Sequence, residues 1–113
     1  MPSQDDLAAL EKLFYTLYNS LNDAYWAAST GEAKDEIHGA QDVVNQVLDT
    51  LDTADLESNN DAMAALTKNL QDAMKDLSDL QNKLNAIVHS VAIANTAIQA
   101  ITDALTAAGK IVA

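Results

Sequence analysis

Hydrophobic residues recur along this chain at alternating intervals of three and four, which is the spacing of one face of an α-helix. The first run predicts a helix over residues 4–29, and Ser3 and Asp6 have the spacing of a capping box at its start. We expect Gly31 to end this helix in the left-handed conformation. The apolar seam of this run consists of Leu7, Leu10, Phe14, Leu17, Leu21, Ala24 and Ala28.

A second run predicts a helix over about residues 32–55. Its heptad register does not continue that of the first run, so we expect the chain to reverse direction near Gly31. Gly39 lies inside this helix, where a glycine costs about 1 kcal/mol relative to alanine. We expect it to let another helix approach closely. The seam consists of Ile37, Ala40, Val44, Val47, Leu51 and Ala54.

The third run is the longest, and Ser58 with Asp61 has the spacing of a capping box at its start. One helix of about 50 residues would be about 75 Å long, whereas a domain of this size has a diameter of roughly 35 Å. We therefore favour a break near His89-Ser90, where β-branched residues disfavour the helix and Ser90 is able to cap a new one. This predicts helices over residues 59–88 and 90–108.

These patterns predict an all-α protein with one domain over residues 1–113, folded as an antiparallel helical bundle with heptad seams. Four helices are favoured over three helices with one long C-terminal helix, which would project and need a partner to cover it. Only three glycines and one proline interrupt the chain, and its many alanines and leucines favour helix.

The chain is strongly acidic, with 17 Asp and Glu residues against six lysines and no arginine, for a formal net charge of −11. Such a surface repels nucleic acid and anionic membranes, whereas it favours solubility or a basic partner. The absence of cysteine excludes disulfides and thiol chemistry. The polar, acidic N-terminus is unlike a signal peptide, so a cytoplasmic location is favoured, with non-classical secretion by a bacterium as the alternative.

The candidate chemistry is sparse. Asp35 and His38 lie three apart on one helical face, which is half of a zinc site at best. The acids between Asp49 and Asp61 lack the glycine and the glutamate that an EF-hand calcium loop needs. No spacing pairs a nucleophile with a base, and no glycine-rich phosphate loop is present. We therefore predict no catalytic, metal or cofactor site, no small-molecule ligand and no enzymatic activity.

Residues 86–108 are the most apolar segment, with Asp103 as their only charge. A helix that is apolar nearly all round must be surrounded by protein or lipid. Insertion of its large apolar residues gains about 3 kcal/mol, but Asp103 alone offsets up to about that amount. A central, buried bundle helix is therefore favoured over a membrane-inserting segment.

The combined features predict a non-enzymatic protein–protein interaction module, namely a self-associating acidic helical bundle. Its partner is a second copy or a basic protein, which it would mask as small acidic immunity proteins do, by analogy of fold and charge. The alternative is a soluble component of a membrane-active, helical pore-forming system that inserts residues 86–108. The predicted interface residues are Ile87, Val91, Ile98, Ile101 and Leu105.

Overall fold

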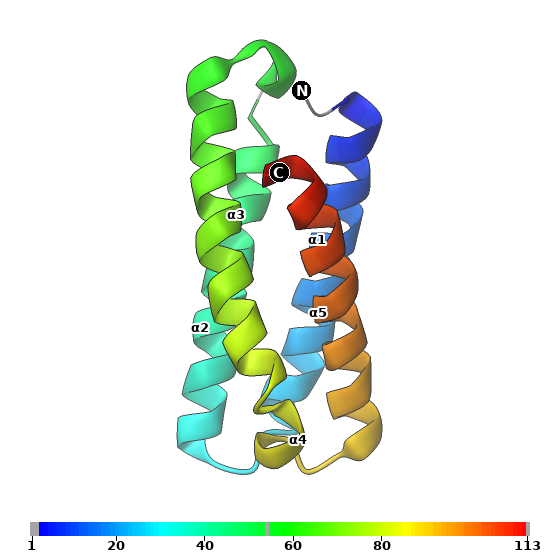
Figure 1. The fold of residues 1–113 in the computed structure, drawn as a ribbon. Helices are drawn as coiled ribbons and strands as arrows, with labels where there is room; N and C mark the ends of the chain where they lie inside the picture. The colour runs from blue at the N-terminus through cyan, green and yellow to red at the C-terminus, as the bar shows by residue number, and fades with distance from the viewer. Residues whose placement is uncertain (1–2, 54, 113) are drawn as a thin grey trace.

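Four long α-helices pack side by side around one hydrophobic core, as seen in a computed structural model that describes residues 3–53 and 55–112 (Figure 1). This confirms the all-α fold and the four-helix bundle, and the run after residue 59 does not form one long helix. In chain order the elements are α1 (Gln4–Trp26), α2 (Gly31–Leu51), the 3₁₀ turn η1 (Leu56–Ser58), α3 (Asn60–Gln81), the one-turn helix α4 (Leu84–Ile87) and α5 (Val91–Val112).

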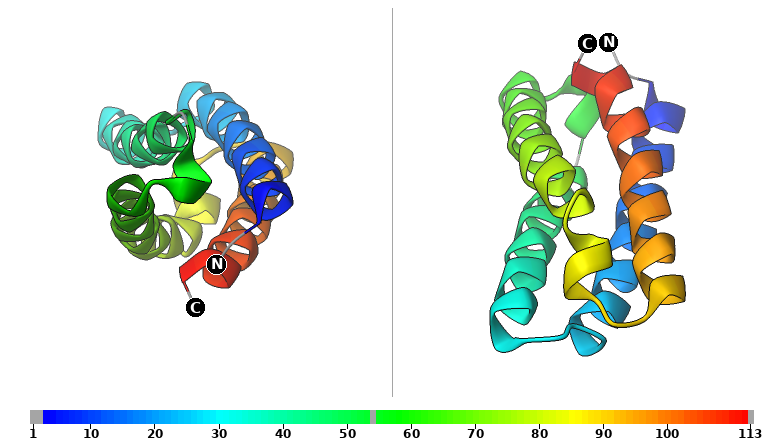
Figure 2. Two further views of the ribbon diagram at one scale, coloured as in Figure 1. Left: turned by 90° about the horizontal axis from the view of Figure 1, so that it is seen from above. Right: turned by 60° about the horizontal axis from the view of Figure 1, so that its bottom comes forward.

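Successive long helices run in opposite directions. Each long helix contacts its two neighbours in the cyclic order α1, α2, α3, α5. The helices α1 and α5 form one side of the bundle, and α2 and α3 form the other (Figure 1). Helices of 21 to 23 residues are about 33 Å long, consistent with overall dimensions of 44 × 20 × 20 Å. The start of α1 and the end of α5 lie at the same end of the bundle (Figure 2).

The predicted seams supply the core. Each large apolar side chain buried there contributes about 1.5–3 kcal/mol relative to an exposed position. The largest fully buried side chains, which come from all four long helices and from α4, are Phe14, Leu10, Leu17, Leu21, Ile37, Leu66, Leu70, Leu77, Leu84, Ile101, Val44 and Val47.

Local side chains cap the helix starts. The predicted residue is the cap at α1, but a different residue is the cap at α3. The N–H of Asp6 donates to Ser3 Oγ (3.1 Å) and the N–H of Ser3 donates to Asp6 Oδ2 (3.2 Å), which is the predicted capping box. At α3 the prediction is wrong, because Asn59 is the cap and accepts a hydrogen bond from the Ala62 N–H (3.0 Å). The Ser58 hydroxyl instead donates to the carbonyl oxygen of Asp55 (3.1 Å).

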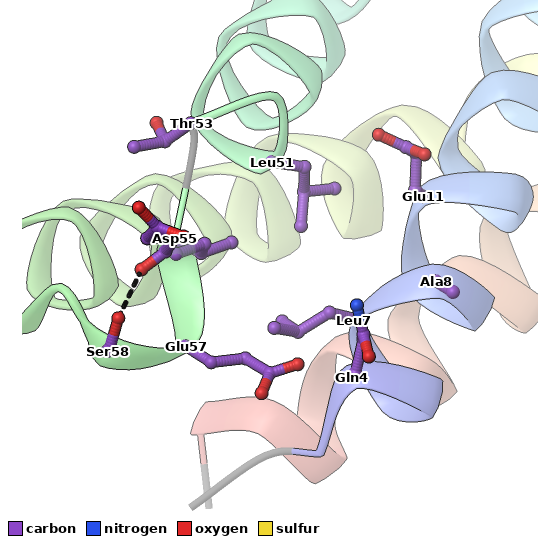
Figure 3. Close-up of a pocket in the computed structure, with 10 residues that line it drawn as sticks. Gln4, Leu7, Ala8, Glu11, Leu51, Thr53, Asp55, Glu57 and Ser58 are labelled. Atoms are coloured by element: carbon purple, nitrogen blue, oxygen red, sulfur yellow. Dashed lines mark hydrogen bonds between the residues drawn. The ribbon is translucent and has the colours of Figure 1, made fainter.

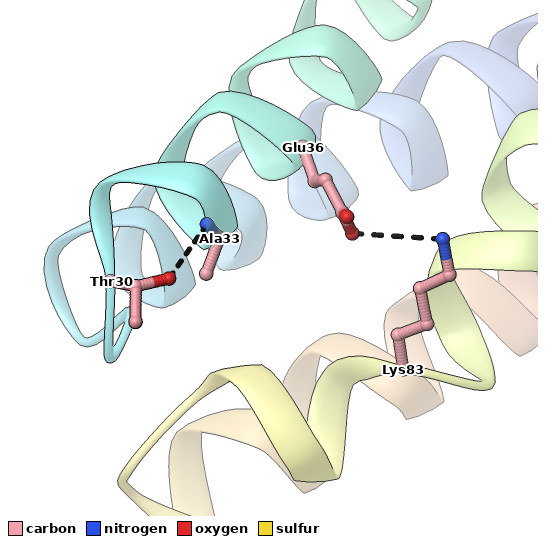
Figure 4. Close-up of polar contacts among 4 residues, drawn as sticks. All are labelled: Thr30, Ala33, Glu36 and Lys83. Carbon is pink, nitrogen blue, oxygen red and sulfur yellow. Dashed lines mark hydrogen bonds and ion pairs between the residues drawn. The ribbon is translucent and has the colours of Figure 1, made fainter.

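Two expectations for glycine are wrong. Gly31 does not end the first helix, since α1 already ends at Trp26 and Gly31 is the first residue of α2, capped by Thr30 (Figure 4). None of the three glycines has a positive φ angle. Gly39 does not admit a neighbouring helix, because it is exposed and a Cβ built on it would meet no heavy atom within 4 Å.

The connection from α2 to α3 begins earlier than expected, because α2 ends at Leu51 and not near residue 55. Ala54, the last position of its predicted seam, lies outside the described residues. Asp55 follows with a φ of 56° in the left-handed region, which aspartate tolerates better than most residues.

The connection from α3 to α5 contains the predicted break and a second break that was not predicted. Val88 is extended, and Ser90 caps α5 by accepting a hydrogen bond from the Ile93 N–H (3.3 Å), so the break at His89-Ser90 is confirmed. However, α3 ends at Gln81 and not near residue 88, and a turn at Asn82 and Lys83 leads into α4. This turn keeps Leu84 fully buried.

The two connections at the lower end of Figure 1 are joined to each other. Ala28 and Val88 form an isolated antiparallel bridge, in which the Ser29 N–H donates to the Ile87 carbonyl (2.8 Å) and the His89 N–H donates to the Ala27 carbonyl (3.1 Å). Toward the same end, an ion pair of 3.8 Å joins Lys83 Nζ to Glu36 of α2 (Figure 4). The bridge holds the start of α5 beside the end of α1.

Candidate interaction surface

The α5 helix is not surrounded by protein, contrary to the expectation for residues 86–108. Its buried side is narrow and made mainly of small residues: Ala94, Ala97, Ala100, Ile101, Ala104 and Ala108. Its exposed side is broad: Val91, Ala92, Asn95, Thr96, Gln99, Thr102, Asp103, Thr106 and Lys110. The buried side of α5 therefore consists largely of alanines, and the opposite side faces solvent.

The structure separates the five predicted interface residues. Ile101 is fully buried, and Ile87, Ile98 and Leu105 are partly buried and pack against the core. Only Val91 is well exposed, with 71% of its surface accessible. Four of the five therefore contribute to the bundle itself, and the available surface of α5 is its polar side, which carries two charges.

This side of α5 differs electrostatically from the rest of the molecule. Only Asp103 and Lys110 are charged on α5, and the adjacent α1 carries no charge from Leu13 to Asn22. By contrast, α2 and α3 carry nine acidic residues and three lysines (five and one on α2, four and two on α3). The charge of the protein is thus concentrated away from α5.

The exposed threonines of α5 add little polarity, because their hydroxyl groups bond to their own helix. Thr96, Thr102 and Thr106 donate to the carbonyl oxygens of Ala92, Ile98 and Thr102 at 3.0, 3.1 and 2.9 Å. The single acid and single lysine of α5 leave its exposed side without net charge.

Two separate hollows lie between α1 and α5 on this surface, and we call them together the α1/α5 groove. Its lower hollow, near the start of α5, has a volume of about 140 Å³ and is lined by Ser20, Asp23, Ala92, Ile93 and Thr96. Its upper hollow has a volume of about 310 Å³ and is lined by Asp6, Ala9, Leu13, Asp103, Thr106, Ala107, Lys110 and Ile111. The groove was not predicted from the sequence, although Leu13, Ala107 and Ile111 were recognisable as apolar positions beside the seams.

A separate hollow of about 450 Å³ lies at the end of the bundle where α1 begins, between α1, α2 and η1 (Figure 3). Its apolar floor includes Leu7 and Leu51, and acids line it at Glu11, Asp55 and Glu57. Burial raises the pKa of Glu11 above its ordinary value of 4.5, and a hydrogen bond with Asp52 and the charge of that residue raise it further. Glu11, Asp55 and Glu57 make the hollow acidic.

An aromatic cluster at the α1–α2 turn contains the most exposed aromatic side chain. Trp26 is 69% exposed and meets Tyr25 edge to face at 5.1 Å between ring centroids. The Lys34 ammonium lies 5.3 Å from the Trp26 centroid, a cation–π distance. His38 pairs through Nδ1 with Asp42 Oδ2 (3.7 Å) and not with Asp35.

Two further findings concern membranes and metals. Over residues 3–53 and 55–112, no helix combines the length and the apolar character needed to span a bilayer. The same part of the chain contains no group of three or more His, Cys, Asp or Glu side chains arranged to hold a metal ion.

Comparison with known protein families, with curated proteins and with solved structures finds no match for this chain.

Proposed function

We propose that this protein is a non-enzymatic interaction module that self-associates through the exposed side of α5 and the adjacent side of α1. The observation that carries the proposal is the charge distribution. Two copies with a net charge of −11 each repel one another, and the repulsion is smallest where both present α5, whose single acid and single lysine cancel.

The size of this side is adequate for a stable contact. One long side of a 44 × 20 × 20 Å bundle has a projected area of roughly 900 Å², and a standard interface buries about 800 Å² on each partner. In this proposal the nine acidic residues of α2 and α3 remain in solvent and keep the assembly soluble.

Sedimentation velocity and light scattering over a range of concentrations test the proposal. We expect a reversible dimer that the double substitution Thr96→Glu/Gln99→Glu weakens by on the order of tenfold, because it places acidic charges at the contact. The matched control Ala64→Glu/Gln71→Glu adds the same charge to exposed positions of α3 and should leave the dimer unchanged. A strict monomer at about 1 mM, the concentration at which even a weak dimer forms, would refute self-association.

A further inference from the structure

We propose that Tyr25 and Trp26 form a binding site for a quaternary ammonium group, which the side chain of Lys34 fills in the free protein. The site lies at the turn between α1 and α2, at the lower end of the bundle in Figure 1. We call the two rings of Tyr25 and Trp26 the aromatic corner. The inference does not depend on self-association through α5.

The two rings of the aromatic corner stand at right angles. Their centroids are 5.1 Å apart and their planes meet at 89°. Tyr25 is partly buried and packs against the core, which holds its ring in place. Trp26 is mostly exposed, so the corner is open to solvent. The arrangement offers a cation two aromatic surfaces at once.

The aromatic corner already holds a cation. The Lys34 ammonium lies over both rings, 5.4 Å from the Tyr25 centroid and 5.3 Å from the Trp26 centroid. Both distances are within the roughly 6 Å at which the negative face of an aromatic ring attracts a cation. The group found there identifies the chemistry that the corner accepts, namely a positively charged nitrogen.

The position of Lys34 in α2 does not by itself favour a lysine. It is the fourth residue of α2, and the positive end of the helix dipole disfavours a cation in the first turn. Among the described residues its ammonium forms no ion pair, so the two rings are its stabilising contacts. Because Lys34 is only partly buried, its flexible side chain is able to leave the corner when a ligand enters.

A quaternary ammonium ligand is favoured over the lysine of another protein. Lys34 is tethered beside the corner, so a free primary ammonium competes with it at a disadvantage. A primary ammonium is also strongly hydrated, whereas a quaternary ammonium exposes methyl groups, donates no hydrogen bond and is the ligand of known aromatic cages. The net charge of −11 attracts cations to the protein surface in general.

Trp26 is the only tryptophan of the chain, so its fluorescence reports on the aromatic corner. We expect tetramethylammonium chloride to change this fluorescence in a saturable way, with a dissociation constant on the order of 10 mM. Sodium chloride at equal ionic strength is the reference, because it screens charges equally without offering a quaternary ammonium. Choline should also bind, whereas the neutral alcohol in which carbon replaces the nitrogen of choline should not.

Three variants test the assignment of the residues. Lys34→Gln vacates the corner and should lower the dissociation constant for tetramethylammonium by on the order of fivefold, because a site that is mostly filled loses affinity in proportion. Tyr25→Leu removes one ring, keeps the reporter and should raise the constant by on the order of tenfold. Lys12→Gln is the matched control, since it removes an exposed lysine elsewhere on α1 and should leave the constant unchanged.

The outcomes either support the inference or overturn it. Saturable binding that Lys34→Gln strengthens and Tyr25→Leu weakens supports it, with circular dichroism to verify that each variant is folded. The inference is overturned if Lys34→Gln shows no saturable change, or if the neutral alcohol produces the same response as choline. It is also overturned if Lys12→Gln strengthens binding as much as Lys34→Gln, because the gain would then come from net charge alone.

Discussion

The helices α3 and α5 have the same length of 22 residues but opposite construction. On its buried side α3 presents four leucines and one alanine, and its exposed side carries four aspartates and two lysines. On its buried side α5 presents five alanines and one isoleucine, and its exposed side is almost uncharged. Both helices have an apolar seam of the same spacing, so the spacing alone does not distinguish them.

The difference in side-chain size explains the difference in role. Leucines of α3 fill the core themselves, whereas the alanines of α5 fill little volume in a core that also holds large side chains of α1, such as Phe14 and Leu10. The larger residues Ile93, Ile98 and Leu105 then lie beside the contact and are only partly buried. A helix built this way packs into the bundle and still offers a surface with only two charges.

The largest effect that tests this comparison comes from exchanging side-chain sizes in the core. We expect Leu70→Ala in α3 to lower the free energy of unfolding by about 2–5 kcal/mol, because it leaves a cavity. Ala97→Leu in α5 should also destabilise, by about 1–3 kcal/mol, because the close contact has no room for the larger side chain. Urea denaturation measures both, with Leu70→Met as the volume-conserving control. An Ala97→Leu variant as stable as the wild type would show that α5 is loosely packed.

The starts of the two helices provide a smaller test. Asn59→Ala removes the cap of α3, a hydrogen bond of 3.0 Å, and Ser90→Ala removes the cap of α5, a bond of 3.3 Å. Each should cost about 1 kcal/mol in thermal or urea denaturation, with the larger loss at Asn59 because its bond is shorter. A glycine at either position should recover most of the loss. If Ser90→Ala has no effect, the start of α5 is held by the Ala28–Val88 bridge alone.

The smallest expected effect concerns Glu11 in the acidic hollow beside α2, which is one of the two strongly charged helices. The pKa of Glu11 is raised in the folded state, so the stability associated with its protonated form is present below pH 4.5 and is lost as the pH rises through the raised value. Glu11→Gln should therefore be more stable than the wild type at pH 7 by up to about 0.5 kcal/mol, a small effect because solvent screens a partly exposed carboxyl. It should be no more stable than the wild type well below pH 4.5.

Thermal denaturation of Glu11→Gln and wild type across this range measures the difference. Asp52→Asn provides the matched variant, since it removes the partner that raises the pKa of Glu11 by hydrogen bond and charge. A difference between Glu11→Gln and wild type that is constant from about pH 3 to pH 7, on both sides of the ordinary carboxyl pKa, would contradict the assignment.

The helical class, the number of long helices and the capping box at Ser3 follow from the amino-acid sequence alone. These features are local or depend on length: the three-and-four spacing identifies a helix, and a helix of about 75 Å does not fit a domain about 35 Å across. The break at His89-Ser90 was predictable for the same reason, because β-branched residues and a capping serine coincide there.

The remaining features depend on how the helices pack. Ser58 and Asn59 are both good caps, and the left-handed backbone at Asp55 precedes a 3₁₀ turn that leaves Asn59 in the capping position. The turn at Asn82 and Lys83 lies where no glycine or proline marks it, and it keeps Leu84 in the core. Which side of α5 faces solvent depends on what covers its alanines, and alanine suits a close helix contact as well as an exposed helix surface. The packing of α1 against α5 decides which side of α5 is buried. The same packing forms the α1/α5 groove.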